Sequence, residues 1–376
     1  MSPSVSIVIP VYMVDKYLAY CLDSVLSQTL TDIEVICIND YSPDECSEIL
    51  SVYSKKDDRI KVINQEKVKG QSRARNMGID LAAGEYIYFL DPDDLFFSSS
   101  SLEHLYSIAK LDNADEVIGA ILRWDEKTEE RTFGYHTTFL KRELRGELFK
   151  NYQFLRSNVT GCNKLLKRSF LDKSGIRFNE ELKKFEDNPF SWKIHLLASS
   201  ISLTVQATYL HRQRLETGPK SIMQSKEEDV RYHVGAAYDM MEFFDHHPEL
   251  TTLRHNCDRY YYYWLSMDVQ EIRKDALSFE QKKTFLGRYL SVLNKIPEAS
   301  RQVMPDQYRN IQSLIDDGEV EKSWAGILLA GEKVSELNDS PELKSIQDEI
   351  DLVCSSLSWR ITAPLRKVMR RIGSAG

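Results

Sequence analysis

Along the first hundred residues, short apolar runs alternate with segments whose apolar residues recur every three to four positions. The apolar runs cover residues 5–9, 33–38, 60–63 and 86–90 and are rich in β-branched and aromatic side chains, which is typical of buried strands. The segments between them predict helices at residues 16–27, after Ser42 and at residues 72–83. This rhythm predicts βαβ units, and therefore a doubly wound, mostly parallel α/β sheet.

Local signals predict where several elements begin and end. Ser42 as N-cap, Pro43 at the first helical position and Glu45 as the partner of a capping box predict a helix start. Gly84 is expected to stop the helix before it. Further along, the pattern predicts a helix at residues 98–110, a strand at 115–122 and a helix at 190–199, with Pro189 in its first turn.

The strand at residues 86–90 runs into an acidic cluster, Asp91-Pro92-Asp93-Asp94. Pro92 cannot donate to a strand ladder, so the strand must end there. Ligands of open α/β sheets bind at the carboxyl ends of the strands, where Tyr12 and Asp40 should also lie. Adjacent carboxylates repel one another unless a cation joins them, and Asp-x-Asp oxygen ligands suit Mg²⁺ or Mn²⁺ bound to phosphates. The alternative interpretation is a polar turn with helix-capping aspartates.

Four motifs, found in the same order along the chain, resemble those of a known family. They are SIVIPVY at residues 6–12, IND at 38–40, GQSRARNMGI at 70–79 and FLDPDD at 89–94. Together they resemble the family 2 glycosyltransferases of the GT-A fold, although the family usually has Ser where this chain has Pro92. The resemblance implies an inverting transferase that uses a nucleotide-sugar, usually a UDP-sugar, and a divalent metal.

The resemblance assigns roles to individual residues of the nucleotide-sugar site. Tyr12 would stack on the nucleobase, Asp40 would accept a hydrogen bond from the base N–H, and Asp93 would bind the metal, with Asp91 nearer the ribose. The full implied set is Pro10, Val11, Tyr12, Asp40, Gly70, Arg75, Asp91, Pro92, Asp93 and Asp94. Taken singly, Asp40 could cap a turn and Arg75 could be a surface residue of a helix.

Two segments of the second half extend the resemblance. Residues 161–166 (GCNKLL) and 185–190 (FEDNPF) resemble the Asn-Lys segment and the Glu-Asp motif of the family, in which the second carboxylate, here Asp187, is the catalytic base. A position at a helix N-terminus would keep Asp187 ionised and ready to take a proton from an acceptor hydroxyl. The alternative is that Asp187 only caps the helix, and the two roles are compatible.

A basic loop follows the last predicted core strand. Residues 209–214 (YLHRQR), followed by Ser221 and Ile222, resemble the Tyr-Arg-x-Arg…Ser-Ile loop of the family. Arg212 and Arg214 would meet the diphosphate or the acceptor, with a solvated basic loop as the alternative. His211 could complete the metal shell with Asp91 and Asp93, although a lone histidine is more often structural.

Composition narrows the class of protein. The 376 residues suggest at least two domains, and the net charge of −8 argues against a general nucleic-acid binder. The six cysteines show no zinc-like spacing, and Cys21 and Cys37 are expected to be buried thiols of a reducing compartment. We find no secretory signal pattern and no run of 18 apolar residues.

The domains are predicted as a GT-A catalytic domain at residues 1–225, a helical domain at 226–340 and a heptad-containing, basic amphipathic tail at 341–376. The aromatic run at 260–264 could stack on sugars but at helical spacing is more often core. The tail pattern suits an anionic membrane surface, and its string at 358–366 resembles tails on bacterial polysaccharide glycosyltransferases. Docking on the protein itself or pairing with another copy, as a homo-oligomer, is the alternative.

The resulting expectation is a bacterial, cytoplasmic inverting glycosyltransferase, peripheral on the inner face of the plasma membrane. Its partners would be a UDP-sugar donor and a glycan or lipid-linked saccharide acceptor. One rival is a sugar-nucleotide pyrophosphorylase, which needs a Gly-rich basic loop that residues 10–13 (PVYM) do not supply. The other is a non-catalytic glycan-binding or scaffold subunit.

Overall fold

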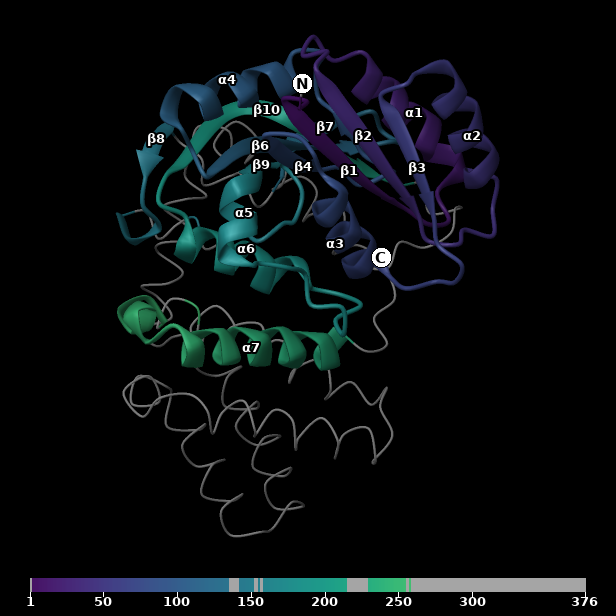
Figure 1. Ribbon diagram of the computed structural model, residues 1–376. Helices are drawn as coiled ribbons and strands as arrows, with labels where there is room; N and C mark the ends of the chain where they lie inside the picture. Colours follow the sequence, from purple (N-terminus) through teal and green to yellow (C-terminus); the bar gives the residue numbers. More distant parts are fainter. Residues whose placement is uncertain are drawn as a thin grey trace, which may run out of the picture. The chain divides into compact units, whose positions relative to one another are not determined.

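The computed structural model describes residues 2–134, 142–151, 155, 158–214, 229–254 and 257 (Figure 1). These residues form a ten-stranded mixed sheet, in which eight strands follow the order β3-β2-β1-β4-β9-β6-β10-β5. The strands are β1 (Val5–Val11), β2 (Ile33–Asn39), β3 (Ile60–Asn64), β4 (Tyr86–Phe89), β5 (Leu95–Phe96), β6 (Glu116–Asp125), β7 (Arg131–Phe133), β8 (Leu144–Glu147), β9 (Lys164–Lys167) and β10 (Ile201–Gln213). The α/β prediction is confirmed, with parallel pairing among β3, β2, β1 and β4 and between β6 and β10, whereas β5, β7, β8 and β9 pair antiparallel.

The parallel pairs bring the strand ends of the first half together. Strands β3, β2, β1 and β4 are neighbours and all run in the same direction. Val11 pairs with Asn39, and the N–H of Asp40 donates to the Val11 carbonyl at 2.9 Å. The N–H of Leu90 reaches the Val8 carbonyl at 3.1 Å. The segments after β1, β2 and β4 therefore leave the sheet along one edge, as the sequence predicted.

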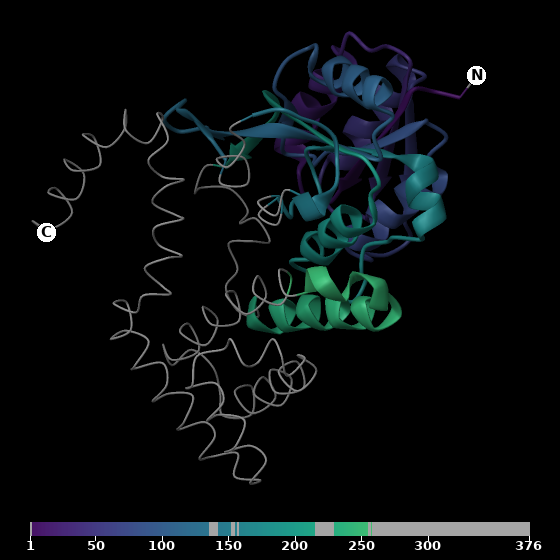
Figure 2. The ribbon, with the colours of Figure 1, turned by 90° about the vertical axis from the view of Figure 1, so that its left-hand side faces the viewer.

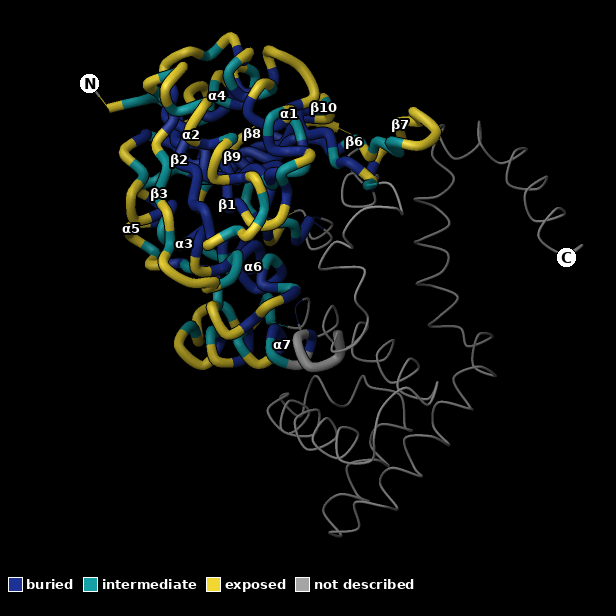
Figure 3. The backbone as a smooth tube through the Cα atoms, turned by 90° about the vertical axis from the view of Figure 1, so that its right-hand side faces the viewer, coloured by how far each residue is buried: buried dark blue, intermediate teal, exposed yellow. Residues whose placement is uncertain are grey.

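Helices cover both faces of this sheet because successive strand residues point to opposite sides. The helices are α1 (Asp15–Leu26), α2 (Cys46–Lys56), α3 (Gln71–Leu81), α4 (Ser101–Asp112), α5 (Arg168–Ser174), α6 (Asp187–Leu197) and α7 (Asp229–His246). Val5, Ile7 and Ile9 share one core with apolar residues of α1, α2 and α4. Ile36 and Ile38 pack with Ala74 of α3 on the other face. Strands β1, β2 and β4 are consequently buried along their whole length, whereas β7 is exposed at the edge of the molecule (Figure 3).

The second half of the described chain places α6 on the α3 side of the sheet. Phe190 of α6 packs edge to face against Phe89 of β4, with ring centroids 5.8 Å apart, and stacks on Phe178 at 3.7 Å. Helix α7 then packs against α6 (Figure 2). These aromatic contacts fix the N-terminus of α6 relative to the end of β4, which brings Asp187 to the acidic cluster.

One local prediction is wrong. Helix α2 begins at Cys46 rather than at Pro43, and neither Ser42 nor Glu45 caps it with a side-chain hydrogen bond. The Ser42 hydroxyl instead accepts a hydrogen bond from the Met13 N–H at 2.7 Å and donates to Asp44 Oδ1 at 2.5 Å. Asp44 Oδ1 in turn accepts from the Cys46 N–H at 3.2 Å. Ser42 therefore joins the segments that follow β1 and β2, and Asp44 supports the helix start.

Other boundaries differ by a few residues. Helix α3 ends at Leu81, before Gly84, helix α4 begins at Ser101, and α6 begins at Asp187 rather than at residue 190. Cys21 and Cys37 are buried and free, as predicted. Within the described parts of the chain, no helix is long and apolar enough to cross a membrane.

Several predictions lie outside the described residues. They concern Ser221 and Ile222, the aromatic run at 260–264, the boundaries near residues 225 and 340, and the heptad and basic tail at 341–376. These stay predictions.

Candidate active site

A single buried guanidinium links the acidic cluster to the predicted base. Arg75 Nη2 donates to Asp91 Oδ1 at 2.8 Å, and Arg75 Nη1 donates to Asp187 Oδ1 at 2.7 Å and to Glu186 Oε1 at 3.0 Å. The Arg75 side chain is 1% exposed, so the interpretation of this residue as a surface helix residue is wrong. Burial alone would lower the pKa of Arg75, but the charges of Asp187, Asp91 and Glu186 outweigh it and raise that pKa. Arg75 is thus a permanent cation.

The carboxylates around Arg75 outnumber it. Burial raises the pKa of Asp91, and Arg75 opposes this rise. Burial and the adjacent charge of Asp187 raise the pKa of Glu186 to about 7, again against Arg75. Gln71 donates a further hydrogen bond to Asp91 Oδ1 at 3.2 Å. The site therefore gathers three carboxyl groups around one cation, and burial together with their mutual repulsion raises the pKa values of Asp91 and Glu186.

Asp187 is the first residue of α6, with Glu186 as N-cap. The sequence prediction that Asp187 lies at a helix N-terminus is confirmed. Its side chain is 28% exposed, and its Oδ2 accepts no hydrogen bond from any described residue. One carboxylate oxygen is therefore fixed by Arg75 while the other stays accessible.

Asp93 pairs with Arg214 at the end of β10. Arg214 Nε and Nη2 each lie 2.8 Å from Asp93 Oδ2. Burial and the neighbouring charge of Asp94 raise the pKa of Asp93, whereas Arg214 lowers it. No described residue donates to Asp93 Oδ1.

Asp94 accepts hydrogen bonds from β10, the strand that precedes the basic loop. It is 1% exposed and accepts from the Tyr209 hydroxyl at 2.6 Å and from the Arg212 N–H at 2.8 Å. His211 Nδ1 lies 3.1 Å from Asp94 Oδ2, and the charge of Asp94 raises the pKa of His211 to about 9. Asp94 is therefore the residue that joins the acidic cluster to β10.

Arg212 packs against aromatic rings that the sequence did not predict as its neighbours. Its Nε donates to the Asp93 carbonyl at 3.0 Å and its Nη1 pairs with Glu126 at 2.8 Å. The guanidinium carbon lies 4.6 Å from the Trp124 ring centroid and 5.2 Å from that of Tyr17. The Arg212 side chain is only 4% exposed and is fixed by these cation–π contacts. Through its hydrogen bond to the Asp93 carbonyl, Arg212 stabilises the acidic loop. Its role toward a diphosphate stays a prediction, as does that of Arg214.

Asp40 shapes the loop between β3 and α3. Its Oδ1 accepts from the Lys69 N–H at 2.8 Å and from Gln65 Nε2 at 2.7 Å, and its Oδ2 accepts from the Gly70 N–H at 2.7 Å. Gly70 has φ = 94°, which glycine adopts without steric cost. A carboxylate offers about four acceptor positions, so Asp40 Oδ2 retains one for a further donor.

The remaining predicted residues lie at the same edge. Pro10 and Val11 are buried in the last residues of β1, and Tyr12 follows with 39% of its surface exposed. Pro92 is buried between the acidic residues. The exposed Tyr12 ring is available for stacking, whereas Pro10 and Val11 contribute packing and backbone.

The described residues contain no ready-made metal centre of three or more Asp, Glu, His or Cys side chains. The chemistry of the donor set nevertheless fits a hard divalent cation. Asp93 Oδ1 is an unengaged carboxylate oxygen, and His211 turns Nδ1 toward the Asp94 carboxylate. The raised pKa of His211 keeps its ring protonated at neutral pH, so Nε2 could bind a metal only after losing its proton. Asp91 is engaged with Arg75 and Gln71 through Oδ1. The metal site stays a prediction.

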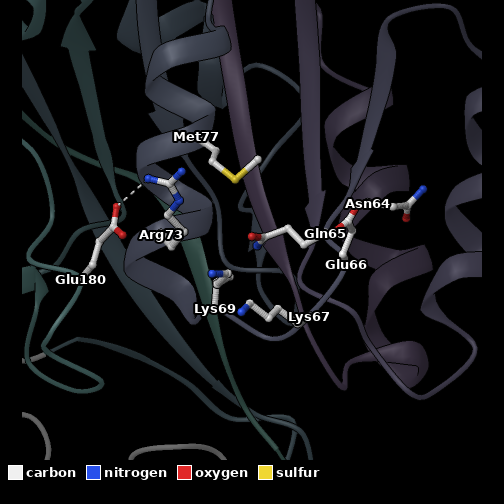
Figure 4. Close-up of a pocket in the computed structure, with 8 residues that line it drawn as sticks. All are labelled: Asn64, Gln65, Glu66, Lys67, Lys69, Arg73, Met77 and Glu180. Carbon is white, nitrogen blue, oxygen red and sulfur yellow. Dashed lines mark hydrogen bonds and ion pairs between the residues drawn. The ribbon is translucent and has the colours of Figure 1, made fainter.

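A separate pocket lies beside the loop that Asp40 holds (Figure 4). The pocket is lined by Asn64, Gln65, Glu66, Lys67, Lys69, Arg73, Met77 and Glu180. Four of these residues, Gln65, Glu66, Lys67 and Lys69, belong to that loop, and the Arg73–Glu180 ion pair, with a distance of 3.2 Å, lies at one side. None of the residues predicted to bind donor or metal lines it, and its mixed charges favour no particular ligand.

Sequence reasoning missed several residues that build the site. Glu186 and Gln71 contact the Arg75–Asp91 centre, and both stand within motifs that the resemblance used. Trp124, Glu126 and Tyr17 surround Arg212 and Arg214 from distant segments. No local pattern marks these last three, because only the folded chain brings them to β10.

Several known proteins resemble this chain in sequence. The family model described as glycosyl transferase family 2 matches residues 6–175. Glycosyltransferase GlyG of Streptococcus pneumoniae is 32% identical over 253 residues, covering 65% of this chain and 79% of GlyG. Poly(ribitol-phosphate) beta-glucosyltransferase of Bacillus spizizenii is 32% identical over 55% of this chain but only 32% of its own length.

A solved structure shares the fold. The crystal structure of S. aureus TarS 1-349 in complex with UDP-GlcNAc matches with a TM-score of 0.68 and 19% identity, covering 89% of this chain and 92% of TarS 1-349. The sheet topology and this likeness define a protein of the GT-A fold. The chain belongs to glycosyl transferase family 2. This membership favours a transferase over the pyrophosphorylase and the non-catalytic subunit.

Proposed function

We propose that this protein transfers a sugar from a UDP-sugar to a hydroxyl group of a cell-surface glycan, with inversion at the anomeric carbon and Asp187 as the base. One observation carries the proposal: Arg75 joins Asp91 of the acidic cluster to Asp187 through hydrogen bonds of 2.8 and 2.7 Å. The residue predicted to meet the donor and the residue predicted to take the proton therefore share one site.

The donor side has the groups that a uridine nucleotide requires. Asp40 Oδ2 keeps an acceptor position that suits the N–H of uracil, and the exposed Tyr12 ring offers a face for stacking. Arg214, already close to Asp93, is placed to meet diphosphate oxygens. The TarS structure, which shares the fold, holds UDP-GlcNAc, and this supports UDP as the nucleotide.

Mg²⁺ or Mn²⁺ is part of the proposal. Asp93 Oδ1 would hold the cation, with His211 Nε2 and Asp91 as further candidates. Such an ion, when bound, supplies a Lewis acid that stabilises the negative charge of the leaving diphosphate.

The base has the geometry for a single displacement. Arg75 fixes Asp187 Oδ1, which leaves Oδ2 to remove the proton of the acceptor hydroxyl. As the proton leaves, the hydroxyl oxygen forms a bond to the anomeric carbon, and the bond to the diphosphate breaks with its electron pair going to UDP. Attack opposite to the leaving group inverts the configuration, and no covalent enzyme intermediate forms.

The acceptor belongs to the class of cell-wall glycans. Relatives are named as transferases of glucose and N-acetylglucosamine to poly(ribitol-phosphate), in Bacillus spizizenii and Staphylococcus aureus. These names support a cell-surface polymer with free hydroxyl groups. They do not distinguish the two sugars.

The experiment measures UDP binding by thermal stabilisation with and without Mn²⁺, and UDP release from UDP-GlcNAc and UDP-glucose. We expect Mn²⁺-dependent stabilisation by UDP in the wild type and its loss in Asp93→Asn. Asp80→Asn is the matched control, because Asp80 is 60% exposed and paired with Arg177 on the surface. A wild type that neither binds UDP nor releases it from either sugar nucleotide overturns the proposal.

A further inference from the structure

Lys164, the first residue of β9, is a fully buried ammonium group that the proposed reaction does not use. Its side chain is inaccessible to solvent, and no carboxylate of a described residue lies within ion-pair distance of its Nζ. Burial lowers the pKa of Lys164. Removing an unpaired ammonium from water is costly, so a protein that keeps one there needs a compensating role for it.

The principal partner of Lys164 is a backbone carbonyl. Its Nζ donates to the carbonyl oxygen of Thr160, and it also lies 3.4 Å from Asn163 Oδ1. The same Thr160 carbonyl accepts a hydrogen bond from Ser191 Oγ at 2.9 Å. Ser191 is a buried residue of α6, the helix that begins with Asp187. One carbonyl thus ties β9 to the helix of the base.

The residue after this carbonyl lies directly against the base. A Cβ atom added to Gly161 would stand 3.0 Å from Asp187 Cγ and 2.6 Å from Asp187 Oδ1, and the second distance is shorter than real Cβ contacts. The oxygen involved is the one that accepts from Arg75. The Gly161 backbone and Arg75 therefore both contact the same carboxylate oxygen, Oδ1.

We propose that Lys164 is a positioning residue for Asp187: by bonding the Thr160 carbonyl together with Ser191, it holds the Gly161 backbone against the Asp187 carboxylate. The inference rests on the proposed function of Asp187 as the base. Lys164 acts through two residues and meets neither donor nor acceptor. A displacement of about 1 Å at a reacting group can lower a rate roughly a hundredfold, so this support affects the chemical step.

The test compares Lys164→Met, Gly161→Ala and their double variant, with Lys167→Met as matched control. Lys167 lies on the same strand, but its Nζ bonds Asn113 at the surface. The readouts are kcat and KM for release of UDP from the sugar nucleotide that the wild type uses, and the Kd for UDP. Ser191→Ala removes only one of the two hydrogen bonds to Thr160 and serves if Lys164→Met does not fold.

We expect kcat to fall roughly ten- to a hundredfold in both single variants, while KM and the Kd for UDP change by less than about threefold. The double variant should lose little more than either single one, because both changes disturb the same contact. Lys167→Met should match the wild type.

Two results overturn the proposal. One is an unchanged kcat in folded Lys164→Met, or in Ser191→Ala and Gly161→Ala if the former does not fold. The other is a parallel loss of kcat and UDP affinity, which indicates a general structural defect. Failure of the proposed function itself is distinguished by Asp187→Asn: turnover that survives this change refutes the base role, whatever the Lys164 variants do.

Discussion

Arg75 Nη1 donates a 2.7 Å hydrogen bond to Asp187 Oδ1 across 112 residues of sequence. This bond connects α3, which follows the third strand, to the first residue of α6. Arg75 simultaneously donates hydrogen bonds to Asp91 and Glu186, so it is the one cation in contact with all three carboxyl groups. The stability of the fold and the placement of the base therefore depend on the same side chain.

Replacing Arg75 by Met is expected to destabilise the fold by about 3 to 5 kcal/mol, because three carboxylates would lose their common buried partner. Urea unfolding at pH 7.5 measures this change.

Arg73→Met is the matched control for Arg75→Met. Arg73 belongs to the same helix, but its side chain is 47% exposed and pairs with Glu180 at the surface. Exposed pairs contribute less than about 1 kcal/mol, so this variant should be nearly as stable as the wild type. Equal stabilities of the two variants would contradict the central position of Arg75.

The raised pKa of Glu186 should make the free energy of unfolding depend on pH. Its pKa is raised by burial and by Asp187 to about 7 from an ordinary value of 4.5. Between these values the folded state keeps a proton that the unfolded state has released, so this group makes stability fall as pH rises from 4.5 to 7. The decline should be on the order of 3 kcal/mol and should be absent in Glu186→Gln.

The measurement compares urea unfolding of the wild type and Glu186→Gln at pH 5 and pH 8. The wild type should lose more stability than the variant between the two values. Parallel curves for the two proteins would show that Glu186 titrates normally.

Asp40 is predicted to bind the nucleobase and also accepts hydrogen bonds from the backbone of the loop before α3. In Asp40→Asn an amide N–H₂ replaces one acceptor oxygen, so either the Lys69 N–H or the Gly70 N–H would face a donor. We expect a loss of about 1 to 3 kcal/mol in stability. UDP affinity should fall about tenfold or more, because the acceptor for the base N–H and the loop geometry are lost together.

Calorimetric titration with UDP checks the Asp40 prediction, with the exposed Asp32 changed to Asn as control. A normal affinity for UDP in Asp40→Asn would remove Asp40 from the donor site.

The sequence predicted the fold well because βα alternation is a local signal. The runs at residues 5–9, 33–38, 60–63 and 86–90 became the parallel strands β1, β2, β3 and β4. The acidic residues after β4 and Asp40 after β2 then had to meet at one sheet edge. The helix start at Ser42 was mispredicted because Ser42 bonds Met13, a partner 29 residues away that no local pattern contains.

The site was predicted less completely than the fold. Arg75, Asp91 and Asp187 were expected to serve one site, but their shared hydrogen bonds depend on side-chain packing between α3 and α6. The aromatic surround of Arg212 combines Tyr17 with Trp124, which are 107 residues apart in sequence. Such contacts depend on the tertiary structure and produce no periodic pattern in the sequence.

The most direct test of the account is Asp187→Asn, with the rate of UDP release and the Kd for UDP measured on the same preparation. Asn retains an oxygen that can accept from Arg75 but cannot take a proton at neutral pH. We expect turnover to fall at least about a hundredfold and the Kd for UDP to stay within about threefold of the wild-type value. Turnover close to that of the wild type would contradict this expectation.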